Sequence, residues 1–232
     1  MRQEAYFCTV KELDELGKDN IPRQLISHTH LIYSSPATLA FNSPGAEGFG
    51  VKRAGLAVPD SVMLIVSPGC CGRNTSVLSS MRAYQDRFYY LLMDETDIVT
   101  GRHLKKIPKA VAEICEGLKK KPSVVMICIT CVDALLGTDM ERVCHKAEEY
   151  AGVPVRPCYM YALTREGRKP PMVHVRQSVY SLLEPKKKKG NVVNLLGYFS
   201  PLTDDCELYD LLHGAGVKTI HEISRCKDYA QY

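Results

Sequence analysis

Short apolar runs alternate with amphipathic stretches along most of the chain after residue 60. The run Val62–Ser67 lacks the alternation of apolar and polar residues typical of a half-exposed strand, so we expect a strand covered by helices on both faces. A second apolar segment lies at Phe88–Leu92, and another buried strand is predicted at Ser123–Thr130. The proline-containing segment Val153–Pro157 is predicted to be a short strand at a sheet edge.

Helices are predicted between these strands from the spacing of apolar residues. The segment His103–Lys119 has an apolar stripe at helical spacing, made of Leu104, Ile107, Val111, Ile114 and Leu118. Further helices are expected around Met140–Ala147 and Val175–Leu183, and before the first strand over Val10–Leu16 and Pro44–Ala54. This alternation implies an α/β fold with a parallel sheet flanked by helices, as in Rossmann-like domains.

A second α/β pattern begins near the C-terminus. The lysine-rich run Lys186–Gly190 is typical of a solvated linker, and a strand is predicted directly after it at Asn191–Gly197. Asp204 or Asp205 is expected to cap the next helix, and Val217–His221 starts another strand. We therefore expect an N-terminal α/β domain over residues 1–185, a linker over 186–190, and the start of a second, incomplete Rossmann-like domain over 191–232. The pattern is typical of an N-terminal piece of a longer protein.

Composition and charge narrow the class of protein. Of the 232 residues, 45% are hydrophobic and 24% are charged, as in ordinary globular domains. No apolar run approaches the roughly 20 residues that span a bilayer, and the first residues lack the apolar core of a secretory signal. We therefore expect a cytoplasmic protein that does not contact membranes. The formal net charge is only +4, and four lysines lie in one run, which argues against nucleic acid as a partner.

Ten cysteines are many for a cytoplasmic chain, because a reducing compartment disfavours disulfides. Most are expected to be buried thiols, with Cys115 and Cys144 on or beside the apolar faces of helices. Cys70, Cys71 and Cys131 differ, since they follow predicted buried strands. Ligands of parallel sheets bind beyond the carboxyl ends of the strands, so these cysteines are expected to converge at one sheet edge.

The residues alone leave several chemical interpretations of these cysteines open. A thiolate cluster at loop tips suits zinc or an iron–sulfur centre. Zinc usually takes paired C-x2-C motifs, and only Cys128 and Cys131 have that spacing, with Cys128 inside a predicted strand. The same placement disfavours a redox dithiol, which normally opens a helix. Adjacent Cys70 and Cys71 could form only a strained disulfide.

Four blocks of sequence stand in a characteristic order: SPGCCG, then ETDIVTGRHLKKIPKAV, then KPSVVMICITCVDALLGTDMERV, and finally NVVNLLGYF with DDCELYDLLHGAGV. The most specific element is Cys-x5-Gly-x-Asp, formed by Cys131, Gly137 and Asp139 after an apolar strand. From about Phe41 to its end, the chain resembles the nitrogenase component 1 family. That family comprises the molybdenum–iron protein subunits, the cofactor-scaffold pair, and the dark-operative protochlorophyllide and chlorin reductases.

The resemblance implies an iron–sulfur cluster held between two subunits. The Gly-Pro-x-Gly-Cys spacing maps one ligand onto Cys71 and leaves Cys70 as a second or alternative ligand, while the strand-end cysteine maps onto Cys131. Asn42 stands where the family has its first cluster cysteine, which disfavours an eight-iron P-cluster. Two copies of the chain, each contributing Cys71 and Cys131, would supply the four thiolates of one [4Fe–4S] cluster.

The resemblance also implies a function and partners. The chain is expected to be an oxidoreductase subunit, paired with itself or with a paralogous subunit, that receives electrons from an ATP-dependent iron protein. No G-x-x-x-x-G-K-[ST] motif is present, so ATP is assigned to that separate protein. The cysteine that would hold a catalytic metallocofactor falls beyond Tyr232, which leaves that cofactor and the substrate unknown. The alternative is a non-catalytic scaffold for assembly or carriage of a metal cofactor.

Overall fold

The computed structural model describes residues 8–22, 51–69, 79–159, 171–184, 190–196, 199 and 201–232. The predicted N-terminal helix is confirmed as α1 (Val10–Leu16), and it begins with a capping box between Thr9 and Glu12. The predicted helix over Pro44–Ala54 lies outside the described residues except for its end, which forms α3 (Val51–Gly55).

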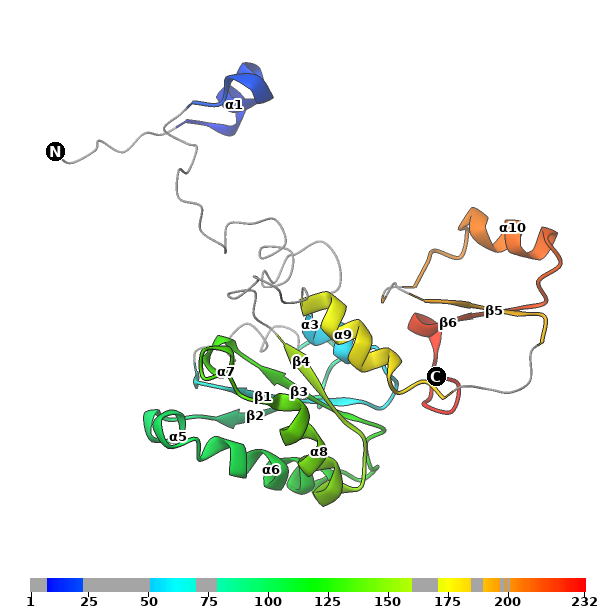
Figure 1. The fold of residues 1–232 in the computed structure, drawn as a ribbon. Coiled ribbons are helices and arrows are strands. Elements are labelled where there is room, and N and C mark those ends of the chain that lie inside the picture. Colours follow the sequence, from blue (N-terminus) through cyan, green and yellow to red (C-terminus); the bar gives the residue numbers. More distant parts are fainter. Residues whose placement is uncertain are drawn as a thin grey trace.

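The centre of the protein is a four-stranded parallel sheet (Figure 1). Its strands are β1 (Val62–Ser67), β2 (Phe88–Leu92), β3 (Val125–Ile129) and β4 (Val155–Tyr159), in the order β2-β1-β3-β4. The predicted α/β fold is therefore confirmed, and β4 lies at a sheet edge as expected. Because β1 and β3 occupy the middle of the sheet, both are buried along their whole length.

Helices cover both faces of this sheet (Figure 1). On one face lie α6 (His103–Gly117) and α8 (Met140–Ala151), and on the other lie α3 and α9 (Pro171–Tyr180). The β1 side chains alternate between the two apolar clusters: Leu64 packs beneath α6 and α8, whereas Met63 and Ile65 pack beneath α3 and α9. The continuous apolar runs of the sequence thus reflect strands with two buried faces.

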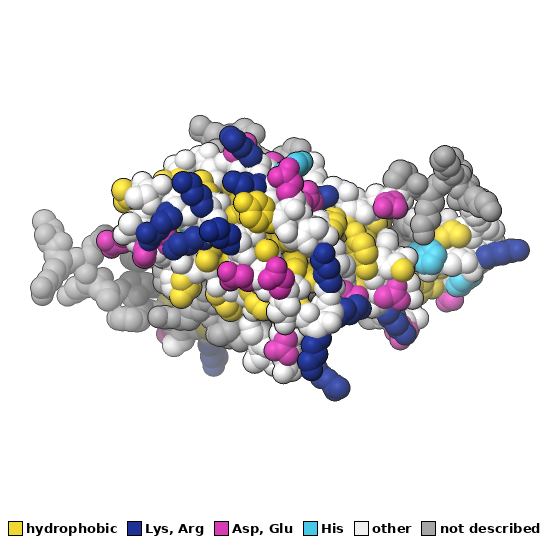
Figure 2. Space-filling model, turned by 90° about the horizontal axis from the view of Figure 1, so that it is seen from below, with side chains coloured by type: hydrophobic (Ala, Val, Ile, Leu, Met, Phe, Trp, Pro, Cys, Tyr) yellow, Lys and Arg dark blue, Asp and Glu magenta, His cyan; other side chains and the backbone are white. Residues whose placement is uncertain are grey.

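The face that carries α6 and α8 is mixed in charge. Figure 2 shows lysine and arginine side chains interspersed with aspartate and glutamate over this face, with apolar side chains between them. In the described part of the chain, no helix combines the length and apolar character needed to cross a bilayer.

The C-terminal region forms a separate two-stranded parallel sheet, which confirms the predicted β-α-β pattern. Its elements are β5 (Val192–Leu195), α10 (Glu207–Gly214) and β6 (Thr219–Glu222). A short 3-10 helix at Ile223–Arg225 follows, and the Tyr232 hydroxyl donates a hydrogen bond of 2.6 Å to the Val179 carbonyl in α9. Of the predicted linker over residues 186–190, only the last residue is described.

One helix cap was predicted wrongly. Neither Asp204 nor Asp205 caps α10, which begins at Glu207 with Cys206 at the cap position and no side-chain capping bond. The two aspartates lie in the preceding turn. There Asp204 forms an ion pair of 2.8 Å with Arg225, so its carboxylate is used in a tertiary contact rather than at the helix end.

Side chains close the outer edge of β4. The Val155 amide donates to Glu148 at 2.9 Å, Arg156 donates to the Val155 carbonyl at 2.9 Å, and the Ser178 hydroxyl donates to the Pro157 carbonyl at 2.7 Å. Proline at position 157 also removes one amide donor from this edge. Backbone groups that a foreign strand would need are therefore already bonded within the chain.

The bond from Ser178 gives a test of this edge. Replacing Ser178 with alanine should lower the free energy of unfolding by about 1 kcal/mol, because the Pro157 carbonyl loses its donor. Urea unfolding measures this loss. Thr100→Ala is the control, since the Thr100 hydroxyl is exposed and bonds only within its own helix. An equal loss in both variants would contradict a special role for Ser178.

Candidate metal centre

The predicted cysteine segments leave the sheet from neighbouring strands. β1 pairs with β3 in parallel, and the last registered pair is Val66 with Ile129. β1 leads into the segment with Cys70 and Cys71, which lies outside the described residues, and β3 leads through Thr130 into Cys131. Both segments therefore start at the carboxyl edge of the two central strands, where α/β proteins bind ligands.

Cys131 is the first residue of a short helix, α7 (Cys131–Leu135), which the sequence pattern did not predict. Two other residues of the Cys-x5-Gly-x-Asp motif have clear local roles. Gly137 has a φ of 65°, a left-handed conformation that favours glycine and turns the chain after α7. Asp139 then caps α8 by accepting a bond of 3.1 Å from the Arg142 amide. The motif thus holds α7 between β3 and α8.

A buried histidine–aspartate pair anchors α7 to the rest of the domain. His103, the first residue of α6, lies with Nε2 at 2.9 Å from Oδ1 of Asp133, and both side chains are fully buried. Its Nδ1 lies 3.0 Å from the Asp97 carbonyl oxygen, which can only accept, so Nδ1 carries a proton. Thr138 also donates to Asp133 Oδ1, at 3.1 Å. Asp133 therefore fixes the position of α7 two residues after Cys131.

Asp97, in the first turn of α5 (Glu95–Thr100), connects this pair to the charged side chains around it. Its buried carboxylate accepts from Arg102 at 2.8 Å and from Lys106 at 2.6 Å, while its amide bonds to Asp94 at 2.6 Å. Hydrogen bonds from Lys106 and then from Arg102 lower the pKa of Asp97 from 3.8 to about 2. Asp97, Arg102 and His103 thus form a bonded set that supports α7 through Asp133.

The depressed pKa of Asp97 predicts an acid-dependent contribution to stability. Because the folded-state value is about 2 and the ordinary value is 3.8, the contribution is complete above about pH 5. It is then lost as the pH falls towards 2. In Asp97→Asn, this pH-dependent contribution is absent, so the stability gap between the two proteins should narrow below pH 4. Urea unfolding between pH 6 and 3 measures the gap, and a constant gap would contradict the ion-pair assignment.

Two hydroxyl groups at the carboxyl ends of β1 and β3 lack partners. Ser67 ends β1 and Thr130 follows β3, and their side chains are at most 1% exposed. Within the part of the chain that the structure describes, neither hydroxyl has a hydrogen-bond partner, and neither does Oδ2 of Asp133. Buried polar groups are normally hydrogen-bonded, so these atoms indicate that hydrogen-bonding groups from outside the described residues belong at the carboxyl edge.

Of the seven cysteines whose burial the structure describes, three are buried thiols, as the sequence predicted, and four are half-buried. Cys144 packs into the cluster beneath α8, and burial raises the pKa of its thiol. Cys115 is half-buried on α6, where burial likewise raises its pKa. Cys128 is fully buried within β3, opposite Cys158 in β4, and belongs to the cluster beneath α3 and α9. Cys128 is therefore part of the core.

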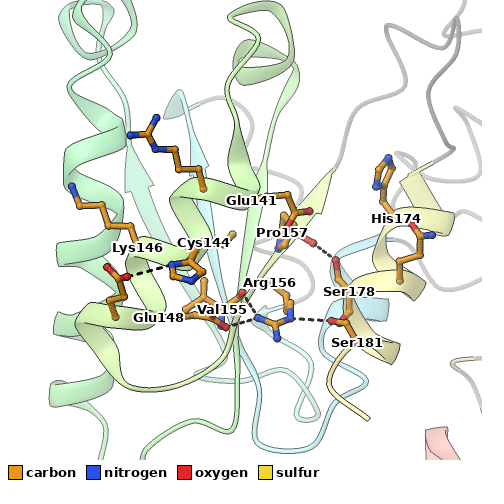
Figure 3. A pocket seen from close by; sticks show the side chains of 14 residues that line it. Glu141, Cys144, Lys146, Glu148, Val155, Arg156, Pro157, His174, Ser178 and Ser181 are labelled. Carbon is orange, nitrogen blue, oxygen red and sulfur yellow. Dashed lines mark hydrogen bonds and ion pairs between the residues drawn. The ribbon is translucent and has the colours of Figure 1, made fainter. Parts of the chain in front are cut away.

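A groove of about 880 Å³ runs along the free edge of β4 between α8 and α9 (Figure 3). Arg156 lies in its centre, where it bonds to Glu148 and, at 2.9 Å, to the Ser181 hydroxyl. Since these charged and polar groups already bond to one another, and since the groove follows the flank of the sheet, we place the candidate centre at the carboxyl edge instead.

The types of residue at that edge are those that would suit an iron–sulfur cluster. A cysteine follows a buried strand after one intervening residue, buried hydroxyls without partners in the described chain lie at the ends of the two central strands, and the segment with two further cysteines follows the adjacent strand in sequence. Among the described residues alone, no three histidine, cysteine or acidic side chains are grouped closely enough to hold a metal ion. A complete ligand set would therefore need Cys70 or Cys71, or a second chain.

Comparison with known proteins gives a consistent result. The family model for nitrogenase component 1 type oxidoreductases matches residues 47–229. The chain is similar to the nitrogenase iron-molybdenum cofactor biosynthesis protein NifE of Rhizobium meliloti, with 28% identity over 73% of this chain and 37% of that protein. It is also similar to NifE of Rhodobacter capsulatus, with 27% identity over 82% of this chain and 42% of that protein.

A solved structure titled "Nitrogenase Cp1 at pH 6.5" has the same fold, with a TM-score of 0.61 and 18% identity. The match covers 90% of this chain and 45% of that one. The chain therefore spans less than half the length of the relatives that it matches.

Proposed function

Because this chain belongs to the family of nitrogenase component 1 type oxidoreductases, we propose that it holds an iron–sulfur cluster at a subunit interface. Cys71 and Cys131 are the proposed ligands, and Cys70 is the alternative ligand beside Cys71 in the sequence. In the leading version of this proposal, the cluster receives electrons from an ATP-dependent iron protein, and the chain is one subunit of a cytoplasmic oxidoreductase complex.

The observation that carries the proposal is the position of Cys131. It lies two residues after the end of β3, opens α7, and this helix is held in place by the buried pair of Asp133 and His103. Thiolates that bind iron–sulfur clusters have to be fixed in geometry and shielded from water, since burial and hydrogen bonds set the potential of the cluster. When bound, the cluster would supply one-electron chemistry, while this chain positions the ligands and excludes water.

Exposed apolar side chains at the same end of the domain support a covering subunit. Leu92 ends β2 and is 59% exposed, while Leu135 at the end of α7 is 73% exposed. Contiguous exposed apolar surface marks interaction sites, and we assign Leu92 and Leu135 to such a surface. With two-fold symmetry, a second copy would bring another Cys71 and Cys131, which completes four thiolates for a [4Fe–4S] cluster. A paralogous subunit is the other possible partner.

Anaerobic purification with metal analysis tests the proposal directly. We expect about four iron and four sulfide per pair of chains, the ratio of one [4Fe–4S] cluster, with a charge-transfer absorption band and a paramagnetic signal after reduction. Addition of the cognate iron protein with ATP should reduce this cluster, and omission of ATP should prevent the reduction. Protein that stays free of iron after anaerobic reconstitution with iron and sulfide would contradict the proposal.

A second candidate is an assembly scaffold that carries a metal cofactor without catalysis. The names of the curated relatives favour it, since several are nitrogenase iron-molybdenum cofactor biosynthesis proteins. A scaffold should release its metal group to an acceptor protein, whereas an oxidoreductase should keep the cluster through repeated cycles of reduction. Incubation of the iron-57-loaded chain with a cofactor-free nitrogenase component 1 protein separates the two, because only the scaffold transfers the label.

Domain boundaries belong to the same proposal. We place an N-terminal cluster-binding domain over residues 1–185, a linker over 186–190, and the start of a second Rossmann-like domain over 191–232. Relatives that are more than twice as long carry further sequence outside the matched region. Any catalytic metallocofactor is assigned to that further sequence or to a partner.

A further inference from the structure

Two buried hydroxyl groups stand side by side at the carboxyl edge of the sheet. Val66 and Ile129 are registered partners in β1 and β3, so the next residue along each chain, Ser67 and Thr130, lies at the same level. The exposed fractions of their side chains are 0% and 1%. Neither hydroxyl has a hydrogen-bond partner in the described part of the chain.

Comparison with the other buried serine side chains sets this pair apart. Four serine or threonine side chains are buried among the described residues. Ser61 accepts a bond of 2.7 Å from Arg87 and donates to the Gly55 carbonyl, and Ser178 donates to the Pro157 carbonyl. Of these four side chains, Ser67 and Thr130 lack a partner in the described part of the chain, where the Tyr180 hydroxyl at the end of α9 is a further unpaired hydroxyl. Burial of an unpaired hydroxyl is unfavourable, so both positions call for an acceptor that the described chain does not supply.

Chain positions indicate the kind of acceptor. Thr130 directly precedes Cys131, and Ser67 lies three residues before Cys70 and four before Cys71. The acceptor groups that the proposed centre would bring to this edge are thiolate and sulfide sulfur atoms, which accept hydrogen bonds from neutral donors. Reduction of a cluster adds negative charge to these sulfur atoms, and a hydrogen bond to sulfur therefore stabilises the reduced state more than the oxidised state.

We propose that the hydroxyl groups of Ser67 and Thr130 donate hydrogen bonds to sulfur atoms of the cluster or of its cysteine ligands, and thereby raise its reduction potential. This inference rests on the proposed function, since it requires that the cluster be bound. It assigns Ser67 and Thr130 as positioning residues that tune the centre, whereas Cys71 and Cys131 bind it.

The test uses the 232-residue chain, reconstituted anaerobically with iron and sulfide, and compares single variants. Ser67→Ala and Thr130→Val each remove one hydroxyl. Thr130→Ser keeps the hydroxyl, and Ser178→Ala removes a buried hydroxyl that is bonded elsewhere in the domain. Redox titration followed by electron paramagnetic resonance should give more negative midpoint potentials for Ser67→Ala and Thr130→Val. The potentials of Thr130→Ser and Ser178→Ala should equal that of the unchanged chain.

Stability of the cluster-free chain gives a second readout. Since the two hydroxyls have no partner within the described protein, Ser67→Ala and Thr130→Val should unfold at the same urea concentration as the unchanged apoprotein or at a higher one. Ser178→Ala should unfold at a lower concentration. A loss in Ser67→Ala or Thr130→Val as large as that in Ser178→Ala would overturn the inference, because that hydroxyl would then be bonded within the apoprotein.

The redox outcomes separate this inference from the proposed function. If the unchanged chain binds no cluster, the proposed function fails and this inference fails with it. If the cluster binds and its potential is the same in Ser67→Ala, Thr130→Val and the unchanged chain, the proposed function stands and only the assignment of the hydroxyls is overturned.

Discussion

Cys131→Ala is expected to reduce the iron content of the reconstituted chain to background. Each copy would lose one of its two proposed thiolates, and in a symmetric pair the cluster would keep only two of four ligands. The fold should remain, because α7 is also held by the bond between Asp133 and His103 and by the cap of α8 at Asp139. Iron and sulfide analysis, with circular dichroism on the same sample, measures both effects.

Cys115→Ala is the matched control for this experiment. Cys115 is a half-buried thiol on α6, so its removal deletes the same chemical group from the same protein at a position away from the strand ends. Iron content in this variant should equal that of the unchanged chain. Full iron content in Cys131→Ala would contradict the assignment of Cys131, and equal loss in both variants would indicate that iron binds without a defined site.

His103→Ala is expected to lower the free energy of unfolding by about 3 kcal/mol, because it leaves a buried polar group without its hydrogen-bond partner. Both side chains of the pair are fully buried, and among the described residues the variant leaves the Asp133 carboxylate with the Thr138 hydroxyl as its one donor. The Asp97 carbonyl loses its donor from the ring as well. Urea unfolding monitored by circular dichroism measures the loss.

A second histidine–acid pair in the same chain is the control. His145 lies 3.4 Å from Glu149, and these side chains are 74% and 64% exposed. His145→Ala should therefore change the stability by less than about 1 kcal/mol. The double variant His103→Leu with Asp133→Leu should recover part of the loss, since no charge is left buried alone. A double variant less stable than His103→Ala would contradict this account.

The apolar pattern predicted the sheet well because its central strands have two buried faces. Val62–Ser67 is a strand with the predicted bounds, and the Ser123–Thr130 segment contains β3 with shorter ends. The stripe between His103 and Lys119 likewise became α6, since three of its apolar side chains pack beneath the sheet. Local periodicity is sufficient for such elements, because the same packing produces both the pattern and the fold.

Parts of the candidate centre depend on contacts that no local pattern contains. α7 has only five residues, too few for a periodic signal. The bond from His103 to Asp133 joins residues 30 positions apart. The same limit applies in the C-terminal region, where Asp204 forms an ion pair with Arg225 and not the predicted helix cap. In the sequence, Asp133 stands out only as a polar residue two places after Cys131, and that position does not identify His103 as its hydrogen-bond partner. Cys70 and Cys71 lie outside the described residues and stay predictions.

The closed edge of β4 would matter before cluster binding, if the chain binds the proposed cluster after it folds. A protein that receives its iron and sulfide after folding exists first as an apoprotein, and its partner surface is then uncovered. Unpaired edge strands of such apoprotein molecules can pair with one another and lead to aggregation. With the Val155 and Pro157 backbone groups already bonded, pairing of a second molecule with β4 is disfavoured, so within the four-stranded sheet β2 is the edge strand more open to self-association. The hydrogen bonds along β4 thus protect the cluster-free protein from aggregation at the sheet edge opposite β2.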